Sequence, residues 1–78
     1  MAKRIPPGDY NIVVTNVDGR DCHVVNVNAV HTRNPTQRIM AAARGACGYA
    51  QNHGQKIRSY RVVNAGTGLI VHEEEMEE

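Results

Sequence analysis

Two residues, Asp18 and Gly19, separate two stretches in which apolar and polar side chains alternate. Asp-Gly in this setting is the strongest short-range signal for a β-hairpin, because both residues tolerate the positive φ that tight hairpin turns need. A loop of these two residues alone places Val17 opposite Arg20. The pairing of both strands is then set, and a slip of one residue would turn every side chain to the wrong face.

This register sorts the side chains of the first hairpin onto two faces, because successive residues of a strand point to opposite sides. It pairs Ile12 with Val25, Val14 with His23, and Tyr10 with Val27. One face is apolar and is expected to face the core: Tyr10, Ile12, Val14, Val25, Val27 and Ala29, with His23 at its edge. The other face mixes polar and apolar residues: Asn11, Val13, Thr15, Val17, Cys22, Val24, Asn26 and Asn28.

A second hairpin is predicted over residues 57–73, turning at residues 64–67. With Ala65 and Gly66 at its tip, Arg58 lies opposite Glu73. The core would then receive Tyr60, Val62, Leu69 and Val71, while Ser59, Arg61, Val63, Ile70 and His72 point away. Because Gly66-Thr67-Gly68 also permits a longer loop, this register is set less firmly than the first.

A single helix is predicted between the hairpins. Asn34 is a good N-cap, Pro35 suits the first helical position, and Gln37 completes the spacing of a capping box. Gly54 provides a plausible stop. The order ββαββ predicts an α+β fold, with a four-stranded antiparallel sheet and one helix packed across one face. Residues 1–78 form a single domain, and residues 1–7 and 74–78 are expected to be flexible ends.

The predicted helix separates into a small-residue buried stripe and an outward stripe. At about 100° per residue, Ile39, Ala43, Ala46, Cys47 and Ala50 share the buried stripe. Ala41, Gly45, Gly48 and Asn52 lie on the opposite side, with Arg38 and Arg44 on its rims. An interior glycine costs a helix about 1 kcal/mol relative to alanine. Either the helix frays near Gly48 and the glycines are merely tolerated, or the outward stripe is a contact surface. The second interpretation predicts a partner-binding set: Arg38, Ala41, Arg44, Gly45, Gly48 and Asn52.

Charge is distributed unevenly along the chain. Five of the eight acidic residues are Glu73, Glu74, Glu75, Glu77 and Glu78. The first 72 residues therefore carry nine Lys and Arg against three Asp, a net charge of +6. Such a basic body attracts phosphate. Nucleic-acid binding would use Arg20, Arg33, Arg38, Arg44, Lys56, Arg58 and Arg61, although no known nucleic-acid-binding motif is present and the outward sheet face offers no aromatic residues for base stacking.

The residues do not favour a membrane protein, a metal-binding protein or an enzyme. No stretch is apolar enough for a membrane span, and two cysteines indicate free thiols in a reducing compartment, so the protein is expected to be cytoplasmic. The histidines and cysteines lack metal-ligand spacing. Cys47 falls on the buried stripe, which disfavours a nucleophile. Gly66-Thr67-Gly68 lacks the lysine and the following helix of a phosphate loop. We expect no enzyme activity, no metal and no cofactor.

The sequence GDYNIVV, the Asp-Gly hairpin, the strand ending VNAV, the alanine-rich helix and the final hairpin together resemble very small phage-encoded proteins, including anti-CRISPR inhibitors. The resemblance covers about residues 8–72 as an order of elements and a style of composition. It implies a non-enzymatic inhibitor that occupies a surface of a larger host protein complex, in the host cytoplasm. The partner would be such a complex, or a second copy in a homodimer. The alternative is a small basic nucleic-acid-binding module.

Overall fold

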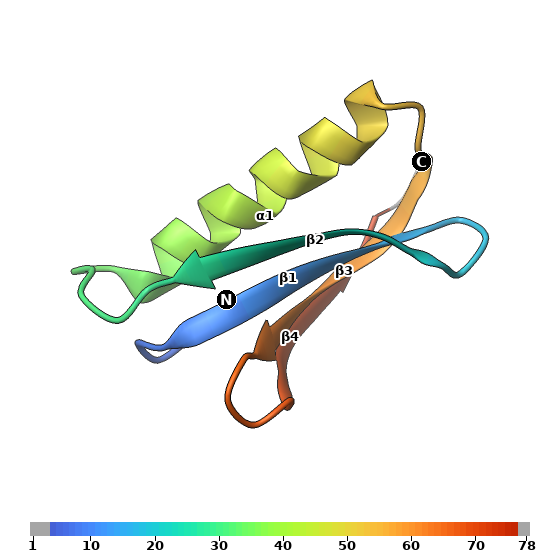
Figure 1. The fold of residues 1–78 in the computed structure, drawn as a ribbon. Coiled ribbons are helices and arrows are strands. Elements are labelled where there is room, and N and C mark those ends of the chain that lie inside the picture. The colour runs from blue at the N-terminus through green and yellow to red at the C-terminus, as the bar shows by residue number, and fades with distance from the viewer. Residues whose placement is uncertain (1–3, 77–78) are drawn as a thin grey trace.

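The computed structural model describes residues 4–76 and has the predicted order of elements. Four antiparallel strands form one open sheet in the order β2-β1-β3-β4, and one helix lies across one face (Figure 1). The predicted α+β class and the single-helix ββαββ architecture are therefore confirmed. The elements are β1 (Asp9–Asn16), β2 (Asp21–Asn28), α1 (Pro35–Asn52), β3 (Ile57–Asn64) and β4 (Ile70–Glu75).

The core lies between α1 and the inner face of the sheet. The buried residues of α1 are the five of the predicted stripe: Ile39, Ala43, Ala46, Cys47 and Ala50. Four of them are small, so α1 approaches the sheet closely and the larger strand side chains fill the layer. The strands contribute Tyr10, Ile12, Val14, Val27, Ile57, Tyr60 and Val62.

The first hairpin keeps the predicted pairs of Tyr10, Ile12 and Val14 but closes differently, so that Arg20 faces Asn16 and not Val17. Ile12 pairs with Val25 and Val14 with His23, as expected. The loop, however, has three residues, because Gly19 N donates to Asn16 O and Asn16 N donates to Arg20 O, both over 2.9 Å. Gly19 adopts the positive φ of +82° that this closure requires. A bulge between Val14 and Thr15 absorbs the extra residue, which is why the pairs farther from the turn are unaffected.

The second hairpin corrects the prediction. Its loop spans Ala65 to Gly68, because Asn64 N donates to Leu69 O over 2.8 Å and Gly68 takes a φ of +77°. The partner of Glu73 is consequently Arg61 and not Arg58.

This longer loop changes which residues of β4 face the core, although Val71 packs against the core as predicted. His72 pairs with Val62 and Glu74 with Tyr60 on the inner face, whereas Ile70 pairs with Val63 on the outer face. A bulge at the Val62/Val63 step adds to the change in register, and Leu69 is 67% exposed instead of buried.

The packed fold reaches into both ends that the sequence predicted to be flexible. Ile5 is buried in the core, and its N–H donates to Thr36 Oγ1 over 2.8 Å. The Tyr10 hydroxyl donates to Pro6 O, also over 2.8 Å. Glu74 and Glu75 belong to β4. Residues 1–3 and 77–78 of the predicted flexible ends lie outside the described residues.

No helix or strand among residues 4–76 covers the outer face of the sheet. Its centre combines Val13 and Val63 with Arg61, whose guanidinium donates to both oxygens of Asp21 and to Thr15 Oγ1 over 3.2–3.3 Å. This is the single ion pair among residues 4–76. No helix within the described part of the chain is long and apolar enough to cross a membrane.

Candidate functional site: the outer face of α1

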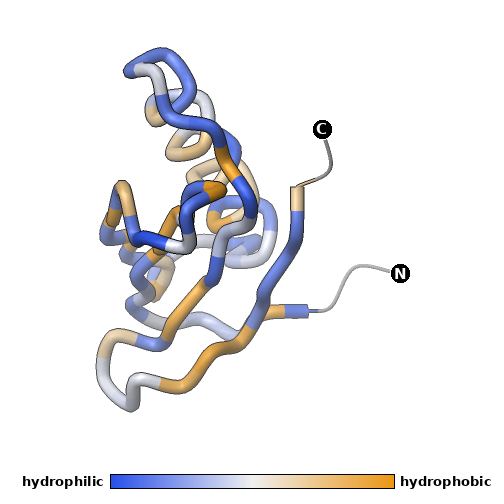
Figure 2. The backbone as a smooth tube through the Cα atoms, turned by 90° about the vertical axis from the view of Figure 1, so that its right-hand side faces the viewer, coloured by the Kyte–Doolittle hydropathy of each residue, from blue (hydrophilic) through white to orange (hydrophobic). Residues whose placement is uncertain are grey.

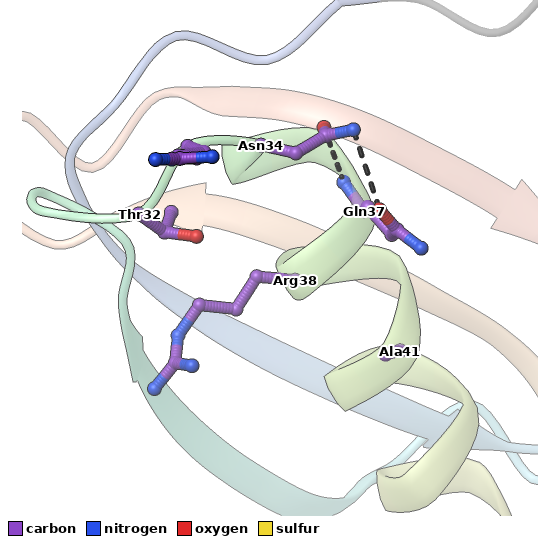
Figure 3. Close-up of a pocket in the computed structure, with 6 residues that line it drawn as sticks. Thr32, Asn34, Gln37, Arg38 and Ala41 are labelled. Atoms are coloured by element: carbon purple, nitrogen blue, oxygen red, sulfur yellow. Dashed lines mark hydrogen bonds between the residues drawn. The ribbon is translucent and has the colours of Figure 1, made fainter.

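The predicted partner-binding residues all lie along one continuous helix. α1 begins at Pro35, with Asn34 Oδ1 accepting from Gln37 N over 3.1 Å as the cap (Figure 3). It runs without interruption through both interior glycines to Asn52, and Gly54 follows with a φ of +85°. The structure therefore contradicts the alternative in which the helix ends near Gly48. The glycines lie in the helix interior, where their cost of about 1 kcal/mol each applies in full.

Nothing in the described part of the chain requires glycine at these two positions. A Cβ built on Gly45 or Gly48 meets no heavy atom within 4 Å outside the adjoining helix backbone. Gly45 is exposed and Gly48 half-buried, and neither has a positive φ. Ala41 and Asn52 are also exposed, so the outward stripe is accessible to solvent at both of its ends. Within this chain alone, alanine would be the more stable choice at both glycines.

The rim of the stripe nearest β2 is anchored to that strand. Arg38 Nε donates to the carbonyl oxygen of Asn28 over 3.2 Å, at the end of β2. Tyr49 stacks on His23 of β2 with ring centroids 4.7 Å apart, and on His53 with centroids 4.1 Å apart. Tyr49 is nevertheless 53% exposed. Arg44, on the opposite rim, is exposed.

This aromatic stack was missed by the sequence reasoning. Tyr49 and His53 have i, i+4 spacing, which brings side chains together on a helix surface. That part of the cluster was visible in the sequence. The contact with His23 depends on how α1 crosses the sheet, and no local pattern contains that information.

A hollow lies beside the N-terminal end of the stripe. It has a volume of about 490 Å³ and combines the loop before α1 with the first turns of the helix (Figure 3). Two of its lining residues, Arg33 and Arg38, are cationic, and the rest are small or polar: Thr32, Asn34, Gln37 and Ala41. Arg38 and Ala41 of the predicted partner-binding set thus share a concave surface with Arg33 of the predicted nucleic-acid set.

The seven cations predicted to contact nucleic acid do not form one surface. Arg38 and Arg44 lie on α1, on one side of the sheet. Arg61 lies on the uncovered side, bound to Asp21. Arg20 is at the hairpin between β1 and β2, and Lys56 and Arg58 are exposed at the start of β3. The part of the set that shares one face with the site is Arg33, Arg38 and Arg44.

The reactive groups are placed apart from the site. Cys47 is buried under α1, and burial, with smaller contributions from Cys22 and Glu74, raises the pKa of its thiol. A raised pKa keeps the thiol protonated, which is the unreactive form. Residues 4–76 contain no group of three His, Cys, Asp or Glu side chains able to hold a metal ion.

The chain was compared with protein-family models, with curated proteins and with solved structures, and none of the three comparisons found a significant match.

Proposed function

We propose that this protein is a small, non-enzymatic binding protein that docks the outer face of α1 on an acidic surface of a larger protein. The observation that supports this most directly is the small-residue stripe of an unbroken helix, in which no contact with residues 4–76 requires glycine at Gly45 or Gly48. Glycine at such positions permits the close approach of a second backbone. A partner that gains from this approach compensates for the stability that the two glycines cost.

The charge of α1 specifies the chemistry of the partner. The helix carries Arg38 and Arg44 and no acidic residue over its 18 positions. Arg33 adds a third cation at the adjoining hollow. Opposite charges across an interface steer association and fix orientation, so the partner surface is acidic. Inhibition of a host complex by a phage-type protein, which the sequence resemblance implies, is one activity that such docking provides.

Nucleic-acid binding through the same cations is the second candidate function. The observation that favours it is the hollow that Arg33 and Arg38 both line. Arg61, bound to Asp21 on the far side of the sheet, adds nothing to this surface. The two functions predict different responses to nuclease and to salt.

The test is capture of the partner from a lysate of the natural host, with and without nuclease, using matched charge reversals. Arg44→Glu changes an exposed residue on the rim of the stripe. Arg20→Glu makes the same change at the β1–β2 hairpin, away from α1. The captured protein is then purified, and its affinity for the wild type and both variants is measured.

We expect an identified acidic protein whose affinity falls at least tenfold with Arg44→Glu and stays unchanged with Arg20→Glu. Capture that disappears with nuclease, and binding to nucleic acid that weakens steeply as salt rises, would support the alternative. Equal affinity for Arg44→Glu and the wild type would refute docking through α1.

A further inference from the structure

The two edges of the sheet differ in a way that bears on association. β2 and β4 are the edge strands. β4 carries Glu73, Glu74 and Glu75 in succession, a hydrophilic run that Figure 2 shows leading to the C-terminal end. Charged residues are a common device that keeps sheet edges from pairing with other chains. β2, with the sequence DCHVVNVN, has no Lys, Arg or Glu, and its one Asp lies at its first position. Its edge lacks this protection.

The hydrogen bonds at the end of β2 identify the backbone groups that its edge leaves free. Gly8 and Ala29 exchange two bonds, from Gly8 N to Ala29 O over 3.4 Å and from Ala29 N to Gly8 O over 2.8 Å. In antiparallel pairing such doubly bonded pairs recur at every second residue. Val27 and Val25 therefore bond to β1, while Val24 and Asn26 direct their N–H and C=O groups away from it. The bond from Arg38 Nε to Asn28 O is consistent with this alternation.

We propose that β2 pairs antiparallel with β2 of a second copy of this chain, joining two four-stranded sheets into one continuous sheet. A two-fold axis at Val25 overlaps residues 22–28, leaves Asp21 outside the paired segment, and places Val24 opposite Asn26 of the copy. Both of these residues present free backbone groups, so the two pairs around the axis are doubly hydrogen-bonded. Two-fold symmetry makes the surface self-complementary. A second copy is the fitting occupant because the paired segments, residues 22–28, bring no like charges together.

In the same arrangement, the side of α1 toward β2 faces α1 of the second copy. A two-fold axis perpendicular to the sheet leaves both helices on the same face. Tyr49, stacked on His23 of β2, then lies on the side of α1 toward the axis. Gly45 precedes Tyr49 by one turn and adds no side chain to that flank. The inference does not rest on the proposed function, because the hydrogen bonds and the side chains of β2 carry it.

The experiment compares two matched charge insertions by sedimentation equilibrium over a range of concentrations. Val24→Lys changes a side chain that is 56% exposed on β2, and Ile70→Lys changes one that is 54% exposed on β4. Both lie on the outer face of the sheet. We expect the wild type and Ile70→Lys to associate to twice the 8.6 kDa mass of one chain. Val24→Lys should weaken association at least tenfold, with an unchanged circular dichroism spectrum.

Amide hydrogen exchange provides a readout at the backbone itself. In the wild type, the amides of Val24 and Asn26 should be protected at high concentration and exchange faster on dilution. A wild type that stays monomeric at millimolar concentration would overturn the proposal. Equal loss of association in both lysine variants would also overturn it, because it would place the contact on the open face of the sheet. Unchanged partner capture by Val24→Lys would separate this result from the test of α1 docking.

Discussion

Replacing Gly45 and Gly48 with alanine measures directly what the two glycines cost the fold. Each lies in the interior of an 18-residue helix, and a Cβ at either position has open space around it. The substitution therefore adds no clash and removes backbone freedom from the unfolded chain. Each change should stabilise by about 0.8–1 kcal/mol. The added methyl groups share no contact in the fold, so the two effects should add to about 1.5–2 kcal/mol.

The assay is thermal and urea unfolding followed by helical circular dichroism, at one fixed protein concentration because association shifts apparent stability. For a domain of this size, the double variant should melt roughly 6–16 °C above the wild type. Its urea midpoint should rise with an unchanged slope. Gly19→Ala is the matched control, because a φ of +82° strains alanine and should cost about 1 kcal/mol.

A double variant that melts at or below the wild-type temperature would refute the reasoning, since it would show that the glycines serve the fold of the single chain. A gain in stability accompanied by a loss of partner affinity would instead support the contact surface. A gain with unchanged affinity would mean that the glycines are merely tolerated.

Two further predictions concern the inner face of β4. Burial, the Glu74 charge and its 3.2 Å hydrogen bond raise the pKa of Tyr60 from 10.0 to about 12. The contribution of the neutral Tyr60 phenol to the free energy of unfolding is fully present below the unfolded-state pKa. It is lost as pH rises from about 10 through 12. Alkaline unfolding should therefore lose part of its pH dependence in Tyr60→Phe, and an identical profile would contradict the linkage. His72 Nε2 is buried without a partner among the described residues. His72→Phe keeps the ring beside Tyr60 and should raise the free energy of unfolding by about 1 kcal/mol; a loss in urea unfolding would show that Nε2 is hydrogen-bonded.

The first hairpin shows how far local patterns reach. The Asp-Gly signal and the alternation of Tyr10, Ile12 and Val14 predicted the partners of these three residues correctly. They missed the three-residue loop and the bulge next to Val14, where Cys22, predicted for the outer face, packs against the core. The helix was predicted with its cap and its buried stripe, because these depend on spacing within one element.

The second hairpin shows where such patterns fail. Gly66 and Gly68 allow turns of different length, and the positive φ of Gly68 belongs to a four-residue loop. The resulting register placed His72 and Glu74 beside Val62 and Tyr60. The apolar pattern alone predicted Leu69, and not His72, opposite Val62. That pattern contains no information about the bulge or about the hydrogen bond that Tyr60 donates to Glu74.

For the candidate site, too, local patterns predicted one part and only tertiary contacts decided the other. The sequence alone determined which residues share the outward stripe of α1 and that Cys47 turns inward, because helical periodicity is a local property. Only the tertiary structure decided that Tyr49 stacks on His23, that Arg61 is separated from the arginines of α1, and that β2 and not β1 forms an edge. These outcomes depend on how α1 carries the chain from β2 across to β3. They follow from contacts between residues far apart in sequence, to which no local pattern is sensitive.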